Sequence, residues 1–274
     1  MIHRLLVRFG NSLFHYRNAL FPLGYLLLFL PSSRLFGDDR IAALVGFSVA
    51  MAGQLIRVVT VGLEYIIRGG KNRQIYAKKL VTGGIFAHCR NPLYLGNVMI
   101  LAGLGLAADS VLFLVFGLGL FVFAYVAIVA AEEEFLRQKF GAEFDAYCKR
   151  VNRFIPRVSG LRATLAGMRF NWRRVITAEY GSAFLWLEAF LFATMQNLHD
   201  SGRITFRDPL SWSLCGLAML VFVAFVAARI LKKSGALGEM RSRTTEAESV
   251  ATAGSAKGAA AGDNEILPLE NVAR

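Results

Sequence analysis

The stretch that decides the fold runs from Arg90 to Glu134 and reads RNPLYLGNVMILAGLGLAADSVLFLVFGLGLFVFAYVAIVAAEEE. Two apolar runs, Leu93 to Ala108 and Val111 to Ala131, are separated only by a short turn, and polar residues stand at both outer ends. A helix needs an apolar run of ~20 residues to cross a bilayer. Because the turn is short, we predict two antiparallel membrane helices whose polar ends, Arg90 and the glutamates from Glu132 onward, meet at one membrane depth.

The composition extends this prediction to the whole chain. The protein has 274 residues, is 55% hydrophobic with 22 Phe, and has a mean hydropathy of +0.46, which is too apolar for an ordinary soluble domain. We therefore predict an all-α fold, a polytopic integral membrane helical bundle of about six transmembrane helices. The expected spans are Leu13 to Phe36, Ile41 to Leu63, Leu93 to Ala108, Val111 to Ala131, Tyr180 to Leu198, and Leu210 to Leu231.

The net charge of +12 is explained by topology. The basic residues of the chain fall between apolar segments. No basic domain with interleaved aromatic residues is present, so nucleic acid is excluded as a partner. The segments Glu64 to Pro92 and Glu132 to Glu179 hold most of the positive charge, which predicts that both face the cytoplasm. Six spans then place both termini in the cytoplasm. Since no organellar targeting segment is evident, we expect a bacterial inner membrane.

The chain divides into three predicted parts. Residues 1–178 form a core of four spans, residues 179–233 add a two-span hairpin, and residues 234–274 form a disordered cytoplasmic tail. The tail is rich in Ala, Gly, Ser and Glu, which cannot bury enough apolar surface to offset the entropy of ordering. The three cysteines, at 89, 148 and 215, show no paired spacing, so neither disulfides nor a metal site is expected.

The two basic segments differ in their expected structure. Glu64 to His88 is broken by glycines and predicts an interfacial connection. Glu132 to Val151 predicts a helix, with a break at Gly141, because apolar residues recur at steps of three and four. That spacing puts Glu133 on the apolar face, where an unpaired charge is costly, so Glu133 needs an arginine or a cationic ligand. The residues of this stripe are Glu133, Leu136, Phe140, Phe144, Tyr147 and Val151.

The start of the third span is suited to ligand binding. Pro92 fits the first turn of a helix, where its missing amide hydrogen costs no hydrogen bond, and the neighbouring amides face any anion above them. Arg90 offers a cation beside that turn, and the acidic cluster of the fourth span offers carboxylates. A ligand with a carboxylate and an ammonium or sulfonium group would fit both.

Two motifs together carry a family resemblance. The pair GIFAHCRNPLYLG and EEEFLRQKFGAEFDAYCKRVNRFIPR, covering about Gly83 to Arg157, resembles the isoprenylcysteine carboxyl methyltransferase family and its phospholipid methyltransferase relatives. The resemblance implies a pocket at the cytoplasmic face for S-adenosyl-L-methionine and a hydrophobic or lipid-like methyl acceptor that arrives from the membrane. Three positions depart from the family pattern: Asn91 replaces histidine, Phe144 replaces tyrosine and Asn152 replaces proline.

The resemblance also assigns roles to individual residues. Glu133, Arg153 and Tyr147 are implied for catalysis, and the latter two would line the acceptor entrance. The implied cofactor contacts are His88, Arg90, Asn91, Pro92, Tyr94, Glu132 and Glu133.

Each of these residues also has a simpler interpretation. Arg90 can anchor a helix end, tyrosines populate membrane interfaces, and Arg153 can bind lipid phosphates. In the later spans, Glu188 is an intramembrane carboxylate for which we predict Arg57 as partner.

Two other functions stay open. One is a sterol-type reductase that holds NADPH at the equivalent interface, and the other is a non-catalytic membrane scaffold or transporter. The acceptor also stays open among carboxylates, amines and thiols.

Overall fold

Helices make up nearly all of the structure. The computed structural model describes residues 2–63, 68–71, 74–77 and 79–235, so most of the predicted disordered tail lies outside the described residues. Contacts group residues 1–230 into one unit and residues 231–274 into another. The elements are α1 Ile2–Gly24, η1 Tyr25–Phe29, α2 Asp39–Leu63, β1 Arg68–Lys71, β2 Gln74–Ala77, η2 Gly84–Ala87, α3 Pro92–Ala107, η3 Phe113–Gly117, α4 Leu118–Phe140, α5 Ala142–Arg150, α6 Leu161–Ala166, α7 Trp172–Asp200 and α8 Pro209–Lys233.

The helical membrane bundle predicted from the sequence is confirmed. In the described part of the chain, 4 helices are long and apolar enough to cross a membrane: Asp39–Leu63, Phe113–Phe140, Trp172–Asp200 and Pro209–Lys233. They contain four of the expected spans almost whole. The protein is therefore a multi-pass membrane protein.

The other two expected spans differ from the prediction. Leu13 to Phe36 is not one continuous helix, because α1 ends at Gly24, η1 follows, and residues 30–38 are irregular. This apolar run also contains Arg17 and Pro22, and α1 is not among the spanning candidates of the described residues. The third expected span is the 16-residue helix α3, whose length of about 24 Å is shorter than the ~30 Å hydrocarbon core.

Helices α2 and α3 pack closely because glycines line their interface. A Cβ added to Gly53 of α2 would lie 2.6 Å from the carbonyl oxygen of Gly96, and one added to Gly103 of α3 would lie 2.5 Å from that of Gly46. Small residues allow this approach in lipid, where dispersion contacts drive helix association. Gly96 and Gly103 of α3 therefore serve helix packing.

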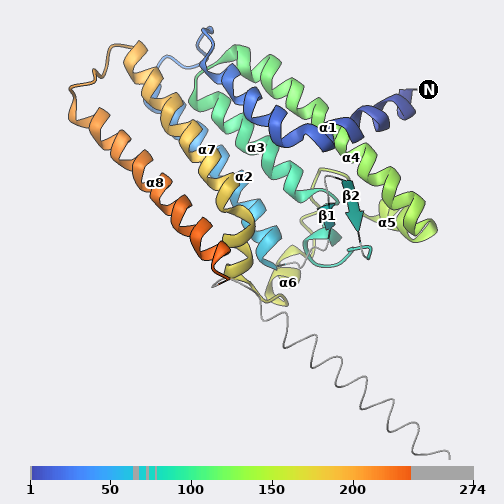
Figure 1. The fold of residues 1–274 in the computed structure, drawn as a ribbon. Helices are drawn as coiled ribbons and strands as arrows, with labels where there is room; N and C mark the ends of the chain where they lie inside the picture. The colour runs from blue at the N-terminus through green and yellow to red at the C-terminus, as the bar shows by residue number, and fades with distance from the viewer. Residues whose placement is uncertain (1, 64–67, 72–73, 78, 236–274) are drawn as a thin grey trace, which may run out of the picture. The chain divides into compact units, whose positions relative to one another are not determined.

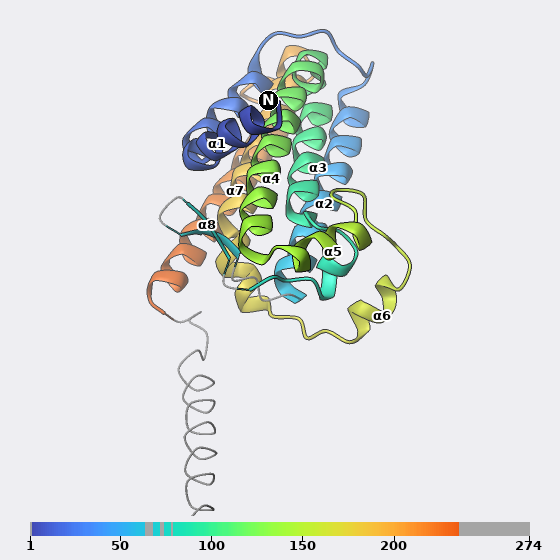
Figure 2. The ribbon, with the colours of Figure 1, turned by 90° about the vertical axis from the view of Figure 1, so that its right-hand side faces the viewer.

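The remaining helices flank this pair. Helix α1 packs on α4, and α7 packs on α2 and α3 (Figure 1). At one end of the bundle lie α5, α6 and the antiparallel β1–β2 hairpin, which pairs Arg68 with Ala77 (Figure 2). The predicted interfacial connection thus contains a short hairpin that glycine content alone did not indicate.

The predicted break in the acidic helix is present. Gly141 has φ +50°, a conformation that favours glycine, and it separates α4 from α5. Beyond it the apolar stripe continues, and Leu136, Phe144, Tyr147 and Val151 form one buried cluster. The stripe therefore folds α5 back onto the end of α4.

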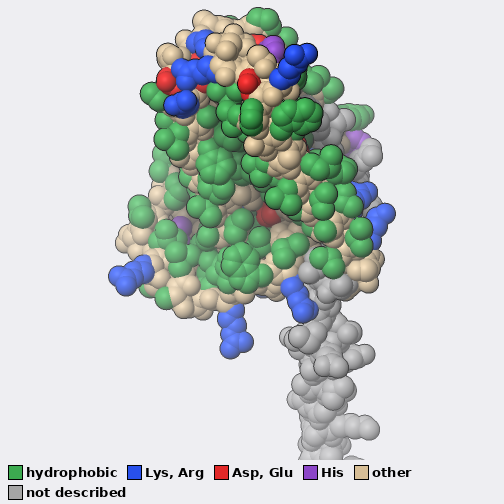
Figure 3. Space-filling model, turned by 90° about the vertical axis from the view of Figure 1, so that its left-hand side faces the viewer, with side chains coloured by type: hydrophobic (Ala, Val, Ile, Leu, Met, Phe, Trp, Pro, Cys, Tyr) green, Lys and Arg blue, Asp and Glu red, His purple; other side chains and the backbone are tan. Residues whose placement is uncertain are grey.

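The outer surface fits a lipid environment. One face of the molecule is mostly hydrophobic across its middle, with charged side chains gathered toward its two ends (Figure 3). Helix α8 contributes exposed Leu217, Leu220 and Val223 to the apolar surface. Such a band is expected where a bundle meets hydrocarbon.

Candidate active site

The polar ends of α3 and α4 meet, as the short turn between them predicts. Pro92 occupies the first turn of α3, and Tyr94 follows within that turn. The Tyr94 hydroxyl donates a hydrogen bond of 2.8 Å to Oε1 of Glu132, near the end of α4. Glu132 is 8% exposed, so this carboxylate lies at a protected position.

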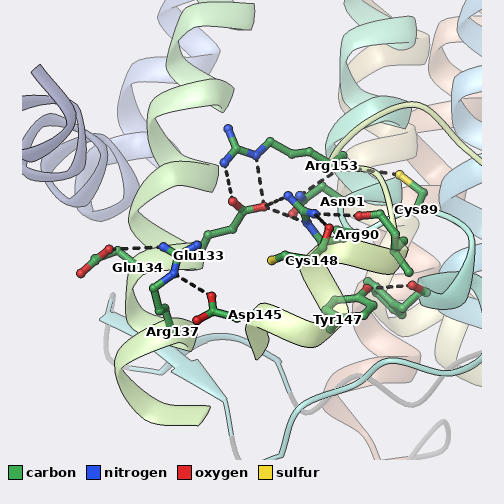
Figure 4. A network of polar contacts seen from close by, with 12 residues as sticks. Cys89, Arg90, Asn91, Glu133, Glu134, Arg137, Asp145, Tyr147, Cys148 and Arg153 are labelled. Carbon is green, nitrogen blue, oxygen red and sulfur yellow. Dashed lines mark hydrogen bonds and ion pairs between the residues drawn. The ribbon is translucent and has the colours of Figure 1, made fainter. Parts of the chain in front are cut away.

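The adjacent carboxylate, Glu133, is held by two arginines (Figure 4). Arg90 approaches its Oε1 with Nη2 at 3.0 Å and Nε at 3.1 Å. Arg153 approaches Oε2 with Nη2 at 2.5 Å and Oε1 with Nε at 3.2 Å. The Glu133 side chain is only 4% exposed, so the partner that the sequence demanded is a pair of arginines.

The same arginine also fixes the backbone after α5. Nη1 of Arg90 donates to the carbonyl oxygens of Cys148 at 3.0 Å and Val151 at 2.7 Å. A guanidinium has five N–H donors. The contacts of Arg90 with Glu133 and with the two carbonyl oxygens use four of them. One donor remains, so a ligand carboxylate can gain at most one hydrogen bond from Arg90 in this arrangement.

Asn91 supports the same loop. Its Nδ2 donates to the carbonyl oxygen of Arg153 at 3.2 Å, and the residue is 3% exposed. An amide both donates and accepts, so Asn91 can make this contact without imidazole chemistry.

A cavity of about 570 Å³ opens beside these groups. It is bounded by α1, η1, α2, η2, α3, α4 and α7, and five of the residues implied by the family resemblance line it. Its volume lies within the range of small-molecule sites. The five are Arg90, Asn91, Pro92, Tyr94 and Glu132.

The other four predicted residues lie outside the cavity lining. Glu133 and Arg153 form the ion pair described above. His88 contacts the carbonyl oxygen of Arg157 at 2.7 Å and the hydroxyl of Thr164 at 2.9 Å, which ties η2 to α6. Tyr147 donates to the carbonyl oxygen of Phe86 at 2.7 Å. Their assigned roles in catalysis and cofactor binding remain predictions.

The cavity also has residues that sequence reasoning missed. Asn97 lies one helical turn beyond Tyr94, and Tyr125 lies two turns before Glu132, so helical spacing could have indicated both. Arg17 and Tyr25 reach the cavity from α1 and η1, for which the sequence offers no signal.

Arg57 lines the cavity too, but its predicted partner is wrong. Nε and Nη2 of Arg57 contact Glu179, at 2.7 and 2.9 Å, and Nη1 donates to Asn97. Gln54 also donates to Glu179, at 3.3 Å. Glu188 lies nine residues later, on the opposite face of α7, where its buried Oε1 has no hydrogen-bond partner in the described structure.

The thiol next to the site is buried. Cys89 is 1% exposed, and its Sγ donates to the carbonyl oxygen of Phe154 at 3.4 Å. Burial raises the pKa of the Cys89 thiol, which keeps it protonated. Cys89 therefore contributes to packing of the loop.

Comparison with known proteins identifies the region that holds this site. Residues 42–143 match the model of the phospholipid methyltransferase family. This region belongs to that family. The match includes most of α2 and all of α3 and α4, and therefore Arg90, Tyr94 and Glu132.

Two curated bacterial proteins are similar to this chain. The nickel-cobalt-cadmium resistance protein NccN of Alcaligenes xylosoxydans xylosoxydans is 32% identical over 129 residues, 46% of this chain and 57% of its own length. The cobalt-zinc-cadmium resistance protein CzcN of Cupriavidus metallidurans is 33% identical over 147 residues, 48% of this chain and 60% of its own length. The matches thus span somewhat more than half the length of these relatives.

Two further comparisons, with metal sites and with solved structures, add nothing to the family match. Among the described residues, no group of three or more His, Cys, Asp or Glu side chains is placed to hold a metal ion. No solved structure matches the chain.

Proposed function

We propose that the protein transfers a methyl group from S-adenosyl-L-methionine to a hydrophobic or lipid-like acceptor at the cytoplasmic membrane interface. The observation that carries this proposal is the cavity where the polar ends of α3 and α4 converge, within residues that match the phospholipid methyltransferase family. A charged cofactor and a membrane-soluble acceptor can meet at such an interface.

The cavity residues fit the charge of this cofactor. S-adenosyl-L-methionine is positively charged at sulfur and carries an ammonium group, and Glu132 supplies a carboxylate in the cavity wall. The rings of Tyr25 and Tyr125 also line the cavity, and aromatic faces attract cations. Arg90 has one N–H left for the cofactor carboxylate, and the first turn of α3 presents backbone amides beside it.

The chain's own residues mainly align the reactants and exclude water. When bound, the cofactor supplies a methyl group on a positively charged sulfur. The Tyr94 hydroxyl fixes the Glu132 carboxylate, so its negative charge is in place before the reaction. Apolar walls from Phe21 and Phe121 limit water, which strengthens the electrostatic contacts.

The nature of the acceptor sets the need for a base. A carboxylate or thiolate needs none, whereas an amine must lose a proton. Glu132 is the carboxylate in the cavity wall that can hold that proton.

Ligand binding tests the cofactor assignment. Calorimetry on the detergent-purified protein compares S-adenosylhomocysteine with NADPH, using Glu132→Gln, Tyr94→Phe and, as control, Glu134→Gln. We expect S-adenosylhomocysteine alone to bind and Glu132→Gln to weaken it about 10- to 100-fold, since a hydrogen bond to a charged group contributes about 1.5–3 kcal/mol. Glu134 pairs with Arg137 outside the cavity and should not matter.

The other outcomes discriminate between the remaining functions. NADPH binding alone would move the assignment to a sterol-type reductase. Binding of neither ligand would favour a scaffold or transporter and would contradict the proposal.

A further inference from the structure

Helix α7 lines two separate cavities. One is the candidate active site, and the other is a cavity of about 570 Å³ between α7 and α8, which lie side by side (Figure 1). The two cavities share no lining residue, and both walls of the second lie outside residues 42–143, which match the family model. The family match therefore assigns no role to this second cavity.

The wall of the second cavity is aromatic around one carboxyl group. Phe184 and Phe192 lie one turn before and one turn after Glu188 on α7, so helical spacing puts all three side chains on one face. From α8, the ring of Phe222 packs on Phe184, with 6.1 Å between ring centroids. Phe184 also stacks on Phe225 of α8 at 4.3 Å, which fixes this end of the cavity.

The carboxyl group has no partner of its own. Among the described residues that line this cavity, Glu188 alone is charged, and its buried Oε1 accepts no hydrogen bond in the described structure. An unpaired carboxylate in apolar surroundings is costly, and an ionisable residue inside a membrane span indicates a functional site. A cation is the group that would complete this site.

The depth of Glu188 restricts the kind of cation. Helix α7 spans Trp172–Asp200, and Glu188 lies 16 residues after its start and 12 before its end, about 24 and 18 Å along the axis. Because the hydrocarbon core is ~30 Å thick, Glu188 lies near its middle. A phospholipid headgroup stays at the interface and does not reach this depth, so the cation must belong to a molecule that is itself soluble in hydrocarbon.

The rest of the wall suits such a molecule. Aromatic faces attract cations, and three phenyl rings surround the carboxyl group. Met195 and Cys215 add polarisable sulfur atoms, which lie 4.0 Å apart across the two helices. The volume of the cavity lies within the range of small-molecule sites.

We propose that the cavity between α7 and α8 binds a lipophilic organic cation, with its charge beside Glu188 and its hydrocarbon groups against Phe184, Phe192 and Phe222. The charge is carried within the apolar body, as in a quaternary phosphonium or an aromatic ammonium ion, because a compact primary ammonium group is strongly hydrated. This site is distinct from the candidate active site and does not depend on methyl transfer.

The test compares two probes of equal shape and opposite charge. Binding of tetraphenylphosphonium and of tetraphenylborate to the full chain in nonionic detergent is measured by equilibrium dialysis, with detergent alone as background. Glu188→Gln removes the charge at nearly constant size, and Phe184→Leu removes one ring. Glu134→Gln is the matched control, because Glu134 pairs with Arg137 outside both cavities, and Glu132→Gln reports binding in the candidate active site.

We expect one saturable site for tetraphenylphosphonium and none for tetraphenylborate. Glu188→Gln should weaken phosphonium binding at least about tenfold, and Phe184→Leu about two- to tenfold, since a ring face attracts a cation less than a carboxylate does. Glu134→Gln and Glu132→Gln should leave phosphonium binding unchanged. Because Oε1 of Glu188 has no partner to lose, Glu188→Gln should not lower the midpoint of thermal unfolding.

A second measurement uses the wild-type protein, so it does not depend on the fold of a variant. N,N′-dicyclohexylcarbodiimide, which modifies carboxyl groups in apolar surroundings, should label Glu188, as read by mass spectrometry of the peptide. Tetraphenylphosphonium should slow this labelling and tetraphenylborate should not. Labelling of Glu188 at the same rate with and without the phosphonium would overturn the proposal.

Three binding results would also overturn it. Equal binding of the two probes would indicate an apolar cavity without charge preference, and the absence of saturable phosphonium binding would leave the cavity to lipid chains or to a second copy of this chain. Unchanged binding in Glu188→Gln, with loss in Glu132→Gln, would move the cation to the candidate active site.

Discussion

Glu133 shows how far single residues can be predicted from the sequence. Its position in the apolar stripe indicated that the carboxylate faces inward and needs a cation. The stripe does not indicate which cation, because Arg90 and Arg153 lie 43 and 20 residues away along the chain. Only the folded loop after α5 brings both guanidiniums to one carboxylate.

Removing the Glu133 charge should destabilise the protein. In Glu133→Gln, Arg90 keeps its two carbonyl contacts but loses its buried counter-charge, and breaking a buried ion pair costs about 3–5 kcal/mol. Because the Arg153 side chain is 42% exposed, we expect a loss of stability near the lower end of this range. Thermal unfolding in detergent is the measurement.

The neighbouring glutamate is the matched control. Glu134 pairs with Arg137 at 3.5 Å on the surface, where an ion pair contributes about 0–1 kcal/mol. If Glu133→Gln and Glu134→Gln lowered the midpoint of unfolding equally, the Glu133 cluster would not stabilise the fold as described.

Loop residues were the least predictable. His88 stands two residues before Arg90 in the sequence, yet its ring points to Arg157 and Thr164 and lies outside the cavity lining. Side-chain direction in irregular backbone follows no period, whereas in helices Tyr94 and Glu132 could be aligned by spacing. The sequence therefore indicated lining residues in α3 and α4, and Arg90 and Asn91 just before α3, but not the position of His88.

At the scale of elements, α7 is one of the helices that the family match does not include. Arg57 of α2 contacts Glu179 of α7, and Gln54 of α2 accepts a hydrogen bond of 2.9 Å from the Trp186 indole. These contacts hold α7 as a wall of the cavity. The sequence predicted the helix but paired Arg57 with Glu188, because apolarity around the whole circumference of a span conceals which face packs inward.

The corrected pairing predicts coupling between α2 and α7. Arg57→Gln and Glu179→Gln should each destabilise the protein by several kcal/mol, and together by less than the sum, with a coupling of about 0.5–3 kcal/mol. The double-mutant cycle is measured by thermal unfolding. The control is the pair Arg57→Gln and Glu188→Gln, whose effects on stability should be additive. Coupling in this control, together with additive effects of Arg57→Gln and Glu179→Gln, would instead support the pairing of Arg57 with Glu188.

At the scale of the whole molecule, the helical bundle was the predictable feature. The sequence predicted the helical bundle because the spans of α2, α4, α7 and α8 are long and apolar. It could not predict the end of α1. Gly24, the last residue of α1, packs against Phe121, whose ring a Cβ at Gly24 would approach within 2.3 Å, and this contact cannot be read from the sequence.

Orientation itself is a prediction. Arg162 and Arg207 are both exposed and lie beyond opposite ends of α7. The basic segment around Arg162 should face the cytoplasm. In a cysteine-free variant, a membrane-impermeant maleimide should label Arg207→Cys in intact cells and Arg162→Cys only after permeabilisation; the reverse pattern would place the candidate site on the outer side.

Methyl transfer itself tests the central claim most directly. Membranes that contain the protein are incubated with S-adenosyl-L-methionine labelled in its methyl group, and label is counted in the organic-solvent extract. We predict incorporation above that of membranes without the protein, lowered about 10- to 100-fold by Glu132→Gln and unchanged by Glu134→Gln. Incorporation equal to the background, from protein that is folded and binds S-adenosylhomocysteine, would contradict methyl transfer to a membrane acceptor.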